Sequence, residues 1–120
     1  MSSIVCVCGS DNLSDMREFL DFVLGISAFN EDIAVIFTDK SLKLIHRIGD
    51  ISPESVGERN FVKTFGMLEL YGIDRIFAEC ENADDEALIE SAAAFIPGLK
   101  PLSSGQCLEL IRGSDHSFTF

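Results

Sequence analysis

The stretch that decides the fold is residues 4–8, with the sequence Ile-Val-Cys-Val-Cys, closed by the polar turn of residues 9–12. Five apolar residues in a row are typical of a strand that is buried on both faces of a parallel sheet. Residues 16–26 follow with apolar side chains at helical spacing, after a cap at Ser14 or Asp15. Residues 33–37, Ile-Ala-Val-Ile-Phe, form a second apolar stretch. The sequence therefore begins with a strand, a helix and a second buried strand.

The same alternation continues to residue 120. Such alternation indicates a parallel sheet with helices on both faces. Five strands in 120 residues predict one domain, residues 1–120, of class α/β: a flavodoxin-like three-layer sandwich with a five-stranded, mostly parallel sheet in the order 2-1-3-4-5. Further helices are expected near residues 39–46, 58–71 (ended by Gly72) and 84–95, and a last helix is expected from a cap at Ser103 or Ser104 to Gly113. Further strands are expected at 73–80, 99–102 and, at an edge, 116–120.

The charge balance narrows the possible partners. Twenty acidic and nine basic residues give a formal net charge of −11, which repels phosphate backbones. Direct binding to nucleic acid or to an anionic membrane is therefore not expected. The sequence has no apolar run near the length of a membrane span and no signal-peptide pattern at its start. We expect a cytoplasmic location.

Cys80 is the candidate catalytic residue. It ends the expected third strand directly before a helix, and a helix N-terminus favours the reactive thiolate. The acidic residues 79, 81 and 84–86 surround it in the sequence and oppose that effect. Two interpretations stay open at this point: a partly buried structural cysteine, or a thiol that carries sulfur.

The other cysteines are expected in the core. Cys6 and Cys8 alternate along one strand and so share a sheet face, while Cys107 lies within an apolar helix. A Cys-x-Cys pair inside a buried strand does not have the loop spacing of a zinc site. No metal site and no cofactor are predicted. If strands one and three are neighbours, Cys8 lies near Cys80.

The turn at residues 8–14 offers a third functional interpretation. A polar turn before a helix N-terminus can hold a phosphate group. This turn has one glycine and an aspartate, so a capping turn is the simpler interpretation. A free-standing module that binds a phosphate ligand stays as an alternative.

Apolar residues exceed what one sheet needs. Hydrophobic residues make up 47% of the chain, and those expected on the helix at 58–71 spread around the helix rather than forming one stripe. Surplus apolar surface of this kind is typical of a subunit interface. The residues assigned to this interface are Phe22, Phe29, Met67, Leu70 and Tyr71.

Four stretches, taken in order, resemble the DsrE/DsrF-like sulfur-relay family, and within it the TusC/DsrF subunit. They are residues 17–37, residues 61–73, the strand that ends at Cys80, and residues 101–120. The resemblance covers nearly the whole chain. It rests on order and length rather than on one catalytic motif.

The resemblance implies a flavodoxin-like subunit that assembles with TusB/DsrH-like and TusD/DsrE-like paralogues. In the Tus branch, such a complex takes persulfide sulfur from TusA and passes it to TusE for 2-thiolation of the wobble uridine of tRNA. In the Dsr branch, the partner is DsrC and the process is sulfur oxidation. The acceptor cysteine of these complexes belongs to the TusD/DsrE-like subunit, and Cys80 lies at the matching place here. The acidic tract after Cys80 departs from that pattern, which favours a structural and non-catalytic role for this chain.

Overall fold

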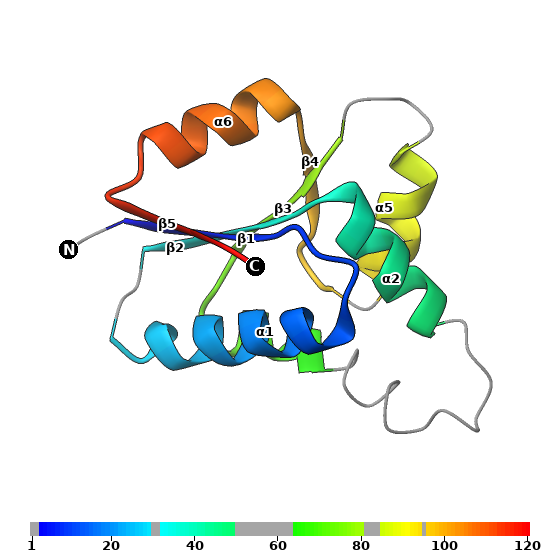
Figure 1. The fold of residues 1–120 in the computed structure, drawn as a ribbon, viewed down its shortest axis with the longest axis horizontal. Helices are drawn as coiled ribbons and strands as arrows, with labels where there is room; N and C mark the ends of the chain where they lie inside the picture. Colours follow the sequence, from blue (N-terminus) through cyan, green and yellow to red (C-terminus); the bar gives the residue numbers. More distant parts are fainter. Residues whose placement is uncertain (1–2, 30–31, 50–63, 81–84, 95) are drawn as a thin grey trace.

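The computed structural model describes residues 3–29, 32–49, 64–80, 85–94 and 96–120. These residues form five strands, five α-helices and a short 3-10 helix, η2 (Figure 1). In this part of the chain, no helix has the length and apolar character that crossing a lipid bilayer requires. The strands are β1 Ile4–Cys8, β2 Ile33–Phe37, β3 Arg75–Glu79, β4 Lys100–Leu102 and β5 His116–Thr119. The helices are α1 Leu13–Ser27, α2 Asp39–Gly49, η2 Thr64–Gly66, α4 Met67–Leu70, α5 Asp85–Ala93 and α6 Ser104–Arg112.

The sheet confirms the predicted fold class and corrects one detail of it. All four strand pairings are parallel, and helices cover both faces, as a three-layer sandwich requires. The strand order is β4-β3-β2-β1-β5, so the predicted order 2-1-3-4-5 was wrong. β2 lies between β1 and β3, and β1 pairs with β5 instead of β3. The prediction of β5 as an edge strand is confirmed.

The observed order follows from which strand must be most deeply buried. All five residues of β2 are buried, and such a strand belongs at the centre of a sheet that is covered on both faces. The predicted order had placed β2 at an edge. β3, by contrast, alternates between buried and half-buried residues, with Arg75 and Glu79 at its ends, which suits a position next to the margin.

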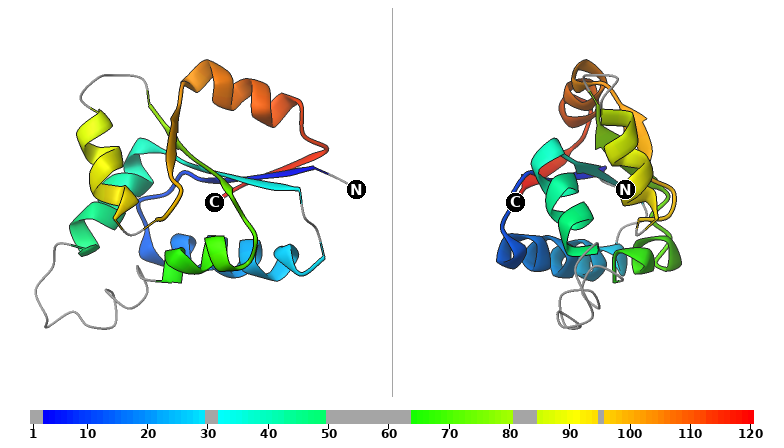
Figure 2. Two further views of the ribbon diagram at one scale, coloured as in Figure 1. Left: turned by 180° about the vertical axis from the view of Figure 1, so that it is seen from behind. Right: turned by 90° about the vertical axis from the view of Figure 1, so that its right-hand side faces the viewer.

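The crossovers then decide which face each helix covers. The connections β1 to β2, β2 to β3 and β3 to β4 all step in one direction, and right-handed crossovers place their helices on one face. The connection through α6 steps back across the sheet to β5 and covers the other face. Figures 1 and 2 show α6 alone on one side of the sheet, with α1 and α4 in one layer on the opposite side.

Two hydrophobic clusters correspond to these two faces. The larger cluster joins side chains of α1, α2, η2, α4 and α5 to one face of the sheet, and it contains Cys6, Cys8 and Ala78. The smaller cluster packs Cys107 of α6 against Val5 and Ile36 on the other face. Because each strand alternates its side chains, the two cysteines of β1 share the larger cluster, as predicted.

Local signals decide where the described helices begin and end. Asn12 caps α1 by accepting hydrogen bonds from the backbone amides of Ser14 and Asp15 at 2.8 and 3.3 Å, so the cap lies two residues before the predicted Ser14. Of the two predicted caps, Ser103 or Ser104, it is Ser103 that caps α6, in a capping box with Gln106. Of the helix predicted over residues 58–71, residues 58–63 lie outside the described residues, and residues 64–70 form η2 and α4.

Candidate functional site

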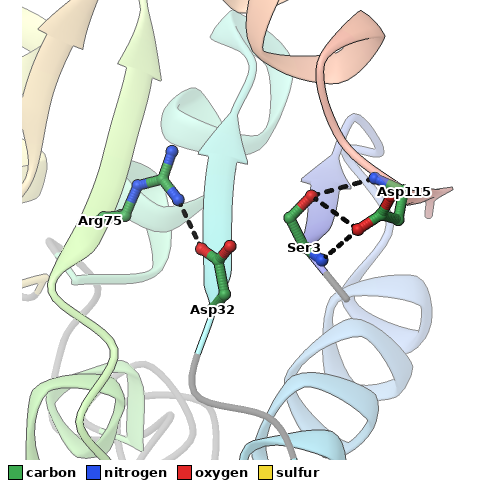
Figure 3. A network of polar contacts seen from close by, with 4 residues as sticks. All are labelled: Ser3, Asp32, Arg75 and Asp115. Carbon is green, nitrogen blue, oxygen red and sulfur yellow. Dashed lines mark hydrogen bonds and ion pairs between the residues drawn. The ribbon is translucent and has the colours of Figure 1, made fainter. Parts of the chain in front are cut away.

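Two polar contacts join residues at the amino-terminal ends of the strands (Figure 3). Arg75 at the start of β3 donates to the Asp32 carboxylate, which precedes β2, at 2.8 Å. The backbone amide of Ser3, before β1, donates to Asp115, before β5, at 2.8 Å. A cavity of about 280 Å³ lies beside these contacts, between the strand starts and α6. These contacts join strands pairwise, so we assign them to holding the sheet together.

Cys80 lies at the opposite, carboxyl-terminal edge. It follows the last residue of β3, and its backbone amide donates to the carbonyl of Leu102 at 2.8 Å, which extends the ladder between β3 and β4 by one bond. Its side chain is half-buried and packs against the larger hydrophobic cluster. In open parallel sheets, ligands bind outside the carboxyl ends of the strands, so the structure places this thiol where chemistry is possible.

The acidic residues near Cys80 in sequence do not all lie near it in space. Glu79 belongs to the opposite face of the sheet, since side chains alternate along a strand. There its carboxylate, after burial, is the second cause of the raised pKa of Cys107. Residues 81–84 and the side chain of Asp85 lie outside the described residues. Of the five acidic residues named from the sequence, the structure therefore removes Glu79 from the immediate surroundings of the thiol.

The expected proximity of Cys8 to Cys80 was wrong. Strand β2 separates β1 from β3, so the two cysteine backbones are at least about 10 Å apart, twice the usual strand spacing. All four cysteines lie within the described residues and none forms a disulfide. The described residues hold no cluster of three or more side chains that could bind a metal ion.

The buried thiols of Cys6 and Cys8 have raised pKa values and therefore low reactivity. Burial raises the pKa of Cys6 to about 11 and the pKa of Cys8 to about 12. For Cys8, hydrogen bonds from Ser41 and Ser10 lower the pKa by less than burial raises it. Because the thiolate is the nucleophile, these two residues are poor candidates for sulfur chemistry, and their prediction as core residues is confirmed.

Thiol reactivity should therefore separate Cys80 from the other three cysteines. In the folded protein at about pH 8, we expect iodoacetamide to label Cys80 first, while Cys6 and Cys8 stay protected because they are buried and protonated. Peptide mapping by mass spectrometry over a time course measures this, with labelling in urea as the control. Equal rates for Cys8 and Cys80 in the folded protein would contradict the placement of Cys80.

The turn at residues 8–14 uses its polar groups internally. The amides of Ser14 and Asp15 donate to the Asn12 side chain, and the Ser10 hydroxyl donates to the Asp15 carboxylate at 2.8 Å. An acidic group thus already lies beside the start of α1, where a phosphate would need donors. This arrangement favours the capping turn over the phosphate-binding interpretation.

Four of the five residues assigned to an interface are exposed. Phe29 after α1 is 91% exposed and Leu70 on α4 is 82% exposed, with Tyr71 at 48% and Met67 at 36%. We call these four residues the apolar patch. Phe22 differs, because it is half-buried and its ring packs at 4.8 Å from Phe118 of β5. Phe118 itself is 40% exposed and was not among the residues predicted for the interface.

The apolar patch and Cys80 lie toward different edges of the sheet. Phe29 shortly precedes β2, and Leu70 and Tyr71 shortly precede β3, so these three residues lie toward the amino-terminal ends of adjacent strands. Cys80 follows the carboxyl end of β3, and the five residues of this strand span about 17 Å from its start to its end. Side-by-side placement of α1 and α4 in one layer agrees with a shared patch (Figure 2). A partner that covers the patch therefore does not need to touch the thiol.

Comparison with known proteins identifies the family. The model of the DsrE/DsrF-like family matches residues 1–120. The chain belongs to the DsrE/DsrF-like family. The resemblance inferred from the sequence is confirmed.

Two relatives illustrate this family membership. A protein named "Protein TusC homolog" from Aliivibrio fischeri is 41% identical over 68 residues, which are 56% of this chain and 54% of that protein. The match thus covers about half of each, and it agrees with the TusC/DsrF branch. The crystal structure of the ychN protein from E. coli aligns over 100% of both chains with a TM-score of 0.70 and 12% identity, which shows that the fold is shared.

Proposed function

We propose that this chain is a structural subunit of a sulfur-relay complex, which assembles with TusB/DsrH-like and TusD/DsrE-like paralogues. The observation that carries the proposal is the apolar patch of Phe29, Met67, Leu70 and Tyr71, within a chain of the DsrE/DsrF-like family. Exposed apolar clusters on a small domain mark surfaces that partners cover. The separation of this patch from Cys80 supports an assembly role that is distinct from thiol chemistry.

Within this proposal, the complex supports 2-thiolation of the wobble uridine of tRNA in the cytoplasm. It receives sulfur from TusA and passes it to TusE, protein to protein. A formal charge of −11 disfavours contact between this subunit and tRNA. The alternative is the sulfur-oxidation branch with DsrC. Neighbouring genes distinguish the two: TusE-like genes indicate tRNA thiolation, and dissimilatory sulfite reductase genes indicate sulfur oxidation.

The position of Cys80 favours one rival function, that of a persulfide carrier. In that reaction, the Cys80 thiolate attacks the outer sulfur of a donor persulfide. A new S–S bond forms on Cys80, the donor S–S bond breaks, and the donor leaves as a thiolate, so no external oxidant is needed. The half-buried position at the end of β3 allows this attack but does not require it.

The substitution Cys80→Ser tests the two roles. If the chain is structural, the complex that contains the variant keeps most of its sulfur-transfer rate, because the acceptor thiol is on another subunit. Transfer of ³⁵S from the donor persulfide protein to the downstream acceptor measures the rate. Near-complete loss with an intact complex would establish the carrier role instead, and Cys107→Ser, a buried thiol on the other sheet face, is the control.

Assembly itself is tested by co-expression with the adjacent genes. Native mass spectrometry should show a stable hetero-oligomer that contains this chain. If the chain stays monomeric and does not bind its paralogues at micromolar concentration, the proposed function is wrong. That result would favour the alternative of a free-standing module that binds a phosphate ligand.

A further inference from the structure

A second surface, lined by other residues than the apolar patch, has the character of a docking groove. It lies between α5 and the edge strand β4, and it has a volume of about 290 Å³. Its floor is apolar and one wall has two carboxylates. The lining residues are Glu86, Ile89, Glu90, Ala93, Leu99 and Pro101. We call this surface the α5–β4 groove.

The sheet register decides which face the groove occupies. Pro101 pairs with Ala78 of β3, and Ala78 belongs to the larger cluster, so the groove opens on the face covered by α5. Lys100 pairs with Phe77 and belongs to the opposite face. Lys100 therefore does not line the groove, and Glu86 and Glu90 are the only charged residues among the six that do. They are four residues apart on α5, on adjacent turns of one side of the helix.

The size and edge of the groove restrict what can bind there. Most small-molecule sites have volumes of about 300–1,000 Å³ and enclose most of the ligand, so an open groove of this volume better suits a few side chains. β4 is a three-residue edge strand with Pro101 at its middle, and proline cannot donate to an added strand. A partner therefore binds through side chains rather than by extending the sheet.

From these features we infer that the α5–β4 groove binds an amphipathic helix of another protein, with apolar side chains in the groove and lysine or arginine beside Glu86 and Glu90. The apolar floor provides the burial, and the two carboxylates provide charge complementarity. The chain offers a second reason for a basic partner, since its net charge is −11. The residues that line this surface are not those of the apolar patch, so the inference does not depend on the proposed sulfur-relay assembly.

The α5–β4 groove lies close to the strand end that holds Cys80. Leu102, the residue after Pro101, accepts the backbone hydrogen bond of Cys80. A helix seated in the groove would thus lie beside the strand end that holds the thiol. The groove would thus place a basic partner next to Cys80.

The test uses the full chain and a synthetic probe. The probe is an acetylated peptide with two leucines one helical turn apart and lysines flanking them, and its control is a scrambled peptide of equal charge. Fluorescence anisotropy should show that the amphipathic peptide binds at least about tenfold more tightly than the scrambled one, because only it can bury its leucines together. Equal binding of the two peptides would overturn the inference, since it would show attraction by net charge alone.

Matched charge variants locate the binding. Glu86→Lys with Glu90→Lys should weaken binding at least about tenfold, because it places like charges against the peptide. Glu18→Lys with Asp21→Lys makes the same charge change on exposed positions of α1 and should change it far less. Methyl NMR should show shifts at Ile89, Ala93 and Leu99. Equal losses in the two double variants, or shifts confined to other methyl groups, would refute the groove as the site.

Discussion

Leu70→Glu is expected to abolish co-purification of this chain with its paralogues, and Met67→Glu is expected to weaken it strongly. Leu70 is 82% exposed and Met67 is 36% exposed in the single chain, so glutamate at either position is solvated and the monomer stays folded. In the proposed assembly, the same carboxylate would be buried against apolar surface without a partner. Hot-spot losses of at least about 2 kcal/mol, roughly thirtyfold in dissociation constant, follow from such a change. Pull-down and native mass spectrometry measure the loss.

The control for this experiment is Leu108→Glu. Leu108 is 47% exposed on α6, which covers the opposite face of the sheet, so the substitution has the same chemistry at another surface. We expect assembly to survive it. If assembly survives Leu70→Glu and Met67→Glu but fails with Leu108→Glu, then the interface lies on the α6 face and the proposed patch is wrong.

Phe19→Ala is expected to have the largest effect on stability. Phe19 is fully buried on α1, and its ring contacts Phe37 and Phe120 edge-on at centroid distances of 5.6 and 5.8 Å. Truncating a buried phenylalanine costs about 3–5 kcal/mol, against a total stability of about 5–15 kcal/mol for a domain. Urea denaturation followed by circular dichroism measures the free energy of unfolding. We expect the midpoint to fall steeply or the variant to be partly unfolded.

Phe29→Ala is the matched control, because it removes the same kind of side chain two residues after the end of α1, where it is 91% exposed. Surface substitutions of this kind change stability by less than about 0.5 kcal/mol. Its effect should appear in assembly instead. A stability loss comparable to that of Phe19→Ala would mean that Phe29 packs inside the domain and does not belong to the apolar patch.

The class of the fold could be predicted from local patterns, whereas the strand order could not. The class follows from the spacing of the apolar residues along the chain and from end signals such as Ser103 and Gly113 for α6. Order depends on which way each crossover steps, and a right-handed connection is possible in either direction. One signal could have decided it: β2 has five apolar residues, which a central strand needs and an edge strand does not.

The candidate site was predicted only in part, for a similar reason. The position of Cys80 follows from its place at a strand end, and exposure of Leu70 follows from helical spacing. The contact between Arg75 and Asp32 joins residues 43 positions apart, which the pairing of β2 with β3 brings together. The α5–β4 groove depends on how α5 packs beside β4, which helical periodicity alone does not predict. Because β2 lies between β1 and β3, the expected proximity of Cys8 and Cys80 was also wrong.

The pairing of β1 with β5 has a consequence for how the chain matures. Ser3 and Asp115, which are joined by a hydrogen bond, are 112 positions apart, so the outer side of the first strand has no neighbour while the nascent chain is still emerging. Ribosomes add about 5–20 residues per second, which leaves that open margin uncovered for several seconds. This margin of the sheet closes only when the segment that forms β5 has been synthesised.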